Sequence, residues 1–193
     1  MSWTIPNILT LLRIILIPVL VVVFYMPGQW SYQISAAIFG LASLTDLLDG
    51  YLARRLNQSS AFGAFLDPVA DKLMVAVALV LLVQRQETYQ VVFAIAAAII
   101  IGREITISAL REWMSEIGES ARVKDSWAGK LKTIFQMTAI GFLLYREDIG
   151  FIPVAMIGEW LLYTAAALTL WSMWNYLASA WPAIRDPRPG DDP

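Results

Sequence analysis

Long apolar runs separated by short polar breaks dominate this chain. Six runs can be read from the sequence, at residues 9–26, 32–48, 73–83, 91–110, 133–145 and 152–177. A helix needs about 20 mostly apolar residues to cross a bilayer. The pattern therefore predicts an all-α integral membrane protein with six transmembrane helices and both termini on one side.

The third run is too short for a span unless it begins earlier. Residues 63–66 can extend it, but the extension then carries Asp67, Asp71 and Lys72 into the span. Ionisable groups at that depth are costly and usually functional. We therefore expect a site on this helix.

Composition supports a membrane domain and sets its limits. Apolar residues make up 58% of the chain and charged residues 16%, and the mean hydropathy is +0.60. We expect one catalytic membrane domain at 1–183 and a mobile cytoplasmic tail at 184–193, which lacks an apolar period. A net charge of -2 without a basic block argues against nucleic-acid binding.

The distribution of cations predicts the orientation in the membrane. The breaks at 27–29, 84–88 and 146–150 hold only Arg85 and Arg146 of the 14 lysines and arginines. The other cations belong to the opposite side, which the positive-inside rule makes cytoplasmic. The first run follows no basic segment and shows no cleavage pattern, so we expect it to remain as an uncleaved helix.

Four aspartates are the strongest candidates for chemistry. On a helix Asp46 and Asp49 lie about 60° apart and Asp67 and Asp71 about 40° apart, so each pair projects from one face. The chain has no histidine or cysteine, which leaves oxygen ligands and favours Mg²⁺ or Mn²⁺. We predict that the four carboxylates bind one or two divalent ions, and two ions can clamp a diphosphate.

Small residues and one arginine between the two pairs suggest a nucleotide site. Gly50, Ala53 and Gly63 leave room for a ligand near the backbone, and the Arg54 guanidinium can bind phosphate. Asp49 belongs to the same predicted nucleotide site. Simpler readings exist, because Asp67 before Pro68 is a good helix start and the arginines at 54 and 55 can serve topology alone.

The spacing D-x2-D-G-x2-A-R-x8-G-x3-D-x3-D, from Asp46 to Asp71, resembles the signature of the CDP-alcohol phosphatidyltransferases at every fixed position. The resemblance implies a six-helix membrane fold, usually a homodimer, that transfers a phosphatidyl group from a CDP-linked lipid to an alcohol and releases CMP. It also implies that Asp71 is the general base.

Further segments are similar to the bacterial branch of the family that makes phosphatidylglycerophosphate. They are residues 7–13, 62–72, 103–105, 108–113 and 129–133. This similarity implies CDP-diacylglycerol as donor, sn-glycerol 3-phosphate as acceptor, contact with membrane lipids, and a place in the bacterial cytoplasmic membrane with the active site facing the cytoplasm.

An anionic acceptor needs cations of its own. Arg103 and Arg111 lie about 80° apart around one helix, and Lys130 and Lys132 open the next segment. We predict that these four bind the acceptor phosphate and that Glu104 orients a cation. Any single cation can instead be topogenic, and this reading is favoured for residues 122 and 124 in a polar loop.

Three other functions stay open at this point. A different acceptor, such as serine, an inositol phosphate or phosphatidylglycerol, fits the same signature. A divalent-cation transporter can use intramembrane carboxylates, but we find no internal repeat, and a bare cation needs no phosphate-binding arginine. A structural adaptor would leave the four acids without a role.

Overall fold

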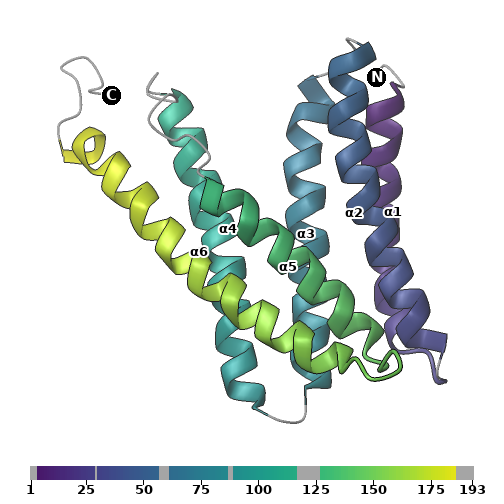
Figure 1. Cartoon of the computed structure of the whole chain (residues 1–193). Coiled ribbons are helices and arrows are strands. Elements are labelled where there is room, and N and C mark those ends of the chain that lie inside the picture. Colours follow the sequence, from purple (N-terminus) through teal and green to yellow (C-terminus); the bar gives the residue numbers. More distant parts are fainter. Residues whose placement is uncertain (1–3, 29, 57–60, 87–88, 117–126, 186–193) are drawn as a thin grey trace.

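The chain folds into six α-helices in a computed structural model that describes residues 4–28, 30–56, 61–86, 89–116 and 127–185 (Figure 1). All six predicted helices are present, and within the described residues the only β-type pairing is an isolated bridge between Ile149 and Ile152. In chain order they are α1 (Ile5–Phe24), α2 (Trp30–Leu56), α3 (Ala61–Arg85), α4 (Gln90–Glu116), α5 (Trp127–Tyr145) and α6 (Val154–Arg185).

The helices extend beyond the apolar runs, mostly at one end of the bundle. At that end α2 continues to Leu56, α4 continues to Glu116, and α3 begins at Ala61. The α6 helix ends at Arg185, two residues inside the predicted tail, and residues 186–193 lie outside the described part. A helix is disfavoured at Asp186 because the next residue is a proline.

The simpler reading of Asp67 as a helix start is wrong. The α3 helix begins at Ala61, so Asp67 and Pro68 lie within it. Proline has no N–H to donate to the carbonyl four residues earlier, which makes this a weak point in the helix. Asp67 is therefore not the residue that caps α3.

The bundle widens towards one end. The α1 helix packs against α2 and α3, α5 packs along α6, and α4 packs against α6. Both the start of α1 and the end of α6 lie at the end where the helices spread apart (Figure 1). A shared apolar core holds the narrower part, with a buried residue from each helix: Leu20, Phe39, Leu79, Ile100, Ile140 and Leu162.

Within the described residues, three helices are long and apolar enough to cross a membrane by themselves. Their candidate spans are Asn7–Phe24, Gln90–Ser115 and Val154–Ala178. The apolar part of α5, Leu131–Tyr145, is shorter, and α2 and α3 carry the candidate acids. Large apolar side chains face outward, including Trp160, Trp171 and Trp174 of α6. These features mark a membrane protein.

A close contact between α5 and α6 gives a test of the fold. A Cβ at Gly158 of α6 would lie 2.9 Å from Leu143 Cγ and 3.3 Å from the Ala139 carbonyl oxygen of α5. We expect Gly158→Ala to lower the melting temperature in detergent, since overpacking a close contact costs about 1–3 kcal/mol. Gly141→Ala is the matched control, because its Cβ meets no atom within 4 Å. Equal melting temperatures for the two variants would contradict this packing.

Candidate active site

Polar residues on one face of α1 hold the acids of the next two helices. Arg13 is only 1% exposed and forms an ion pair with Asp46 of α2, with 2.8 Å between Nη1 and Oδ1. The Thr10 hydroxyl, one turn earlier, donates to the Asp67 carboxylate of α3. These two contacts fix the acid-bearing helices against α1, and neither was predicted from the sequence.

Three of the four predicted carboxylates come together at the wide end of the bundle. Asp46 lies close enough to Asp67 and Asp71 for their charges to interact, and Asp71 also interacts with Glu104 of α4. Asp49 lies on α2, but its side chain is outside the described part of the chain. The charges of these three acids therefore interact, and the convergence of all four carboxylates on one metal site stays a prediction.

The chemistry of these donors suits a hard divalent cation, because all of them are carboxylate oxygens. Among the described side chains, however, no three acids are close enough together to form a metal centre. Arg13 and Thr10 already occupy oxygens of Asp46 and Asp67. A two-metal centre would need Asp49 and a shift of these contacts, so it stays a prediction.

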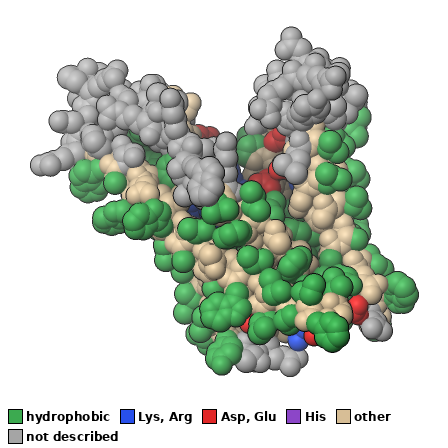
Figure 2. Space-filling model, in the orientation of Figure 1, with side chains coloured by type: hydrophobic (Ala, Val, Ile, Leu, Met, Phe, Trp, Pro, Cys, Tyr) green, Lys and Arg blue, Asp and Glu red, His purple; other side chains and the backbone are tan. Residues whose placement is uncertain are grey.

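A cavity of about 540 Å³ separates the acid-bearing α3 from α4. Figure 2 shows a hollow at this end, with acidic side chains on its walls. Both predicted parts of the active site line the cavity, the base candidate from α3 and the phosphate-binding candidates from α4. Its charged and polar lining consists of Asp71, Lys72, Arg103, Glu104, Ser108, Arg111 and Glu112.

Glu104 links the cations beside this cavity. It accepts a hydrogen bond from Lys132 of α5, which is 2% exposed, and one of 3.2 Å from Arg103. The prediction that Glu104 orients a cation is confirmed. Lys132 also lies within electrostatic reach of Arg103 and Arg111, so three of the four predicted phosphate ligands form one cluster.

Helix α6 completes the cluster with two residues that sequence reasoning missed. Arg103 Nη2 donates to the Ser172 hydroxyl over 3.1 Å, and Arg111 Nη2 donates to the Tyr176 hydroxyl over 3.0 Å. Ser172 and Tyr176 are buried. Ser172 and Tyr176 follow Thr169 by three and seven residues, so the three polar residues form a stripe along an apolar helix. This stripe is the sequence feature from which the two residues could have been predicted.

The remaining predicted site residues lie near the ends of α2, α3 and α5, where the structure does not describe every side chain. Gly63 lies in the first turn of α3, two turns before Asp71. Gly50, Ala53 and Arg54 lie in the last turns of α2, and Lys130 lies in the first turn of α5. The side chains of Arg54 and Lys130 are outside the described part. Their predicted roles in CDP and phosphate binding are untested.

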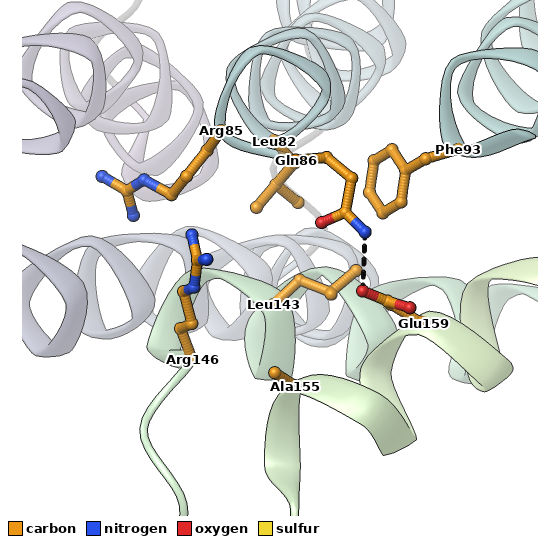
Figure 3. Close-up of a pocket in the computed structure, with 8 residues that line it drawn as sticks. All are labelled: Leu82, Arg85, Gln86, Phe93, Leu143, Arg146, Ala155 and Glu159. Atoms are coloured by element: carbon orange, nitrogen blue, oxygen red, sulfur yellow. Dashed lines mark hydrogen bonds between the residues drawn. The ribbon is translucent and has the colours of Figure 1, made fainter. Parts of the chain in front are cut away.

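A second, smaller cavity of about 130 Å³ lies at the narrow end and holds none of the predicted site residues. Its polar side chains serve contacts between helices (Figure 3). Gln86 donates to Glu159 over 2.7 Å, and Arg85 donates to the Phe24 carbonyl oxygen over 2.7 Å. This cavity is part of the packing that closes the bundle at that end.

Comparison with known proteins identifies the family to which this chain belongs. The sequence profile of the family described as CDP-alcohol phosphatidyltransferase matches residues 3–171. That range covers five helices and most of α6, with every predicted site residue inside it. The chain belongs to this family.

Curated relatives narrow the comparison within the family. A Salmonella choleraesuis protein is 53% identical over 180 residues, covering 93% of this chain and 96% of its own length. An Escherichia coli K12 protein is 52% identical over 186 residues, covering 96% and 100%. Both are named CDP-diacylglycerol–glycerol-3-phosphate 3-phosphatidyltransferase.

The Glu104 cluster predicts an effect on stability. In Glu104→Gln, Lys132 and Arg103 stay buried without their shared anion, and breaking a buried pair in this way costs about 3–5 kcal/mol. We expect the lower end, because Glu104 is 25% exposed, and a clear fall in melting temperature in detergent. Glu112→Gln, an exposed acid on the same cavity, is the control. A similar shift in both variants would show that Glu104 is not the counter-charge.

Proposed function

We propose that this chain transfers the phosphatidyl group of CDP-diacylglycerol to sn-glycerol 3-phosphate, giving phosphatidylglycerophosphate and CMP for anionic phospholipid synthesis. The observation that carries the proposal is the cavity lined by Asp71 on one wall and by Arg103 and Arg111 on the other. The names of relatives more than half identical over nearly the whole chain support the same donor and acceptor.

The cavity suits an acceptor with a phosphate at one end and a hydroxyl at the other. Arg103, Arg111 and Lys132 bind the phosphate, and Asp71 takes the proton from the glycerol 1-hydroxyl. The hydroxyl oxygen then forms a bond to the phosphatidyl phosphorus as the bond from that phosphorus to the CMP oxygen breaks. With no histidine in the chain, a carboxylate is the base best placed for this step.

The donor lies on the side of α2 and α3. Asp46, Asp49, Asp67 and Asp71 would hold two Mg²⁺ or Mn²⁺ ions, and such ions would offset the charge of the diphosphate and of the leaving CMP. Gly50, Ala53 and Gly63 give the nucleotide room, and Arg54 binds a phosphate oxygen. The family membership and the all-oxygen donor set support this assignment.

In the cell, we place the enzyme in the bacterial cytoplasmic membrane as a homodimer with six spans per chain. The wide end with its cavity faces the cytoplasm, so that glycerol 3-phosphate enters from the cytoplasm and CMP leaves into it. Arg85 and Arg146 line the small cavity at the narrow end, whereas Lys72, Arg103 and Arg111 line the large cavity at the wide end, and this distribution supports the orientation.

An acceptor panel tests the activity directly. Purified protein with CDP-diacylglycerol and Mg²⁺ is expected to release CMP with glycerol 3-phosphate, and not with serine, inositol phosphate or phosphatidylglycerol. A chelator should stop the release, and Mg²⁺ or Mn²⁺ should restore it.

In Asp71→Asn turnover should fall about 100-fold or more, which is the usual contribution of a general base.

Asp148→Asn is the matched control for the panel, because Asp148 is an exposed acid in the turn between α5 and α6. It should release CMP like the wild type. Near-normal turnover of Asp71→Asn would contradict both roles proposed for Asp71, as general base and as metal ligand, and would leave the proposed donor and acceptor standing. Transfer to another acceptor would contradict the proposed substrate, and metal uptake into proteoliposomes without CMP release would point to a transporter.

The orientation can be tested because the chain contains no cysteine. A cysteine in place of Phe151, which is fully exposed in the turn between α5 and α6, should react with a membrane-impermeant maleimide in intact spheroplasts. A cysteine in place of Ser115, exposed near the end of α4, should react only after the membrane is opened. The reverse pattern would place the active site outside the cytoplasm.

A further inference from the structure

Helix α6 carries a buried polar stripe that the proposed chemistry does not use. Thr169, Ser172 and Tyr176 are at most 6% exposed and lie three, then four residues apart, so they share one face of the helix. The neighbouring α6 surface is strongly apolar, with Trp171 and Trp174 facing outward. Polar groups buried in such a helix need partners, and α4 supplies them to Ser172 and Tyr176.

Ser172 and Tyr176 of this stripe are hydrogen-bonded to the two arginines of the cavity, Arg103 and Arg111. Ser172 accepts a hydrogen bond from Arg103, and Tyr176 accepts one from Arg111. The ring centroid of Tyr176 also lies 5.4 Å from the Arg103 guanidinium carbon and 5.6 Å from that of Arg111. Both distances fall within the range of a cation–π contact. One tyrosine therefore contacts both guanidinium groups.

The partners that α6 supplies are neutral, and this affects the charge of the site. A carboxylate at either position would bind the guanidinium and compete with an incoming phosphate. A hydroxyl or a phenol ring fixes the orientation of the guanidinium and leaves its positive charge available. Lys132 interacts electrostatically with Arg103 and with Arg111, and Glu104 accepts hydrogen bonds from Lys132 and Arg103.

We infer that Tyr176 and Ser172 are positioning residues for the acceptor phosphate: they hold Arg111 and Arg103 in place without neutralising them, so that the pair selects an acceptor with a phosphate monoester. The inference rests on the proposed function and extends it to α6. Neither residue touches the reacting atoms, and binding of CDP-diacylglycerol does not depend on them.

Tyr176→Phe is the most direct test, because it keeps the ring and removes the hydroxyl. We expect the KM for glycerol 3-phosphate to rise about 3- to 10-fold, the range for one lost hydrogen bond. The Ki of inorganic phosphate as a competitor should rise in parallel. The KM for CDP-diacylglycerol and kcat should stay within about twofold. Ser172→Ala removes the hydroxyl that binds Arg103, and should likewise raise the KM for glycerol 3-phosphate and the Ki of phosphate. This variant is the test if Tyr176→Phe does not fold.

Tyr163→Phe is the matched control on the same helix. Its hydroxyl is buried and has no hydrogen-bond partner among the described residues, so its loss should change none of these constants. An unchanged KM for glycerol 3-phosphate in both test variants would overturn the inference. Equal rises in the KM of both substrates would overturn it as well, since they would indicate general damage.

The wild type separates this inference from the proposed function. If wild-type protein releases no CMP with glycerol 3-phosphate, the proposed function is wrong, and the inference is wrong with it. If the wild type turns over and the two test variants keep its acceptor KM, only the positioning role of α6 is wrong.

Discussion

Glu104 is the acid on which the cationic side of the site depends. It accepts hydrogen bonds from Lys132 of α5 and Arg103 of α4, two side chains that are almost fully buried. A buried cation without a counter-charge is too costly to desolvate, so these side chains need an anion between them. Arg13 and Asp46 meet the same requirement on the other side of the bundle. Charge pairs between helices thus hold the site together.

The number and order of the helices could be predicted from the sequence, because apolar runs report directly on burial in protein and lipid. Their ends could not. Both Asp67 and Pro68 suggest a helix start, yet α3 begins at Ala61. Asp67 is tolerated inside the helix because Thr10 of α1 donates to it. A hydropathy pattern reflects how well each single residue is accommodated in lipid. It carries no information about a hydrogen-bond partner on a neighbouring helix.

The same limit explains which site residues were found. Asp71, Arg103 and Arg111 were predicted because charges in an apolar chain stand out, and the structure places all three around one cavity. Ser172 and Tyr176 were missed, since a serine or tyrosine in an apolar helix is usually a packing residue. No role in the site was predicted for Arg13. Only its contact with Asp46 across two helices reveals another role.

The two sides of the site are built alike and carry opposite charge. The α1 helix supplies Arg13 and Thr10 to the acids of α2 and α3, whereas α6 supplies Ser172 and Tyr176 to the arginines of α4. On one side Arg13 offsets part of the negative charge of the acids, and on the other the neutral Ser172 and Tyr176 add no negative charge beside the arginines. Acids in excess attract cations, and cations in excess attract phosphate. Because the backbones keep the two sides apart, a metal-bound diphosphate and an anionic acceptor can complete the charge balance together.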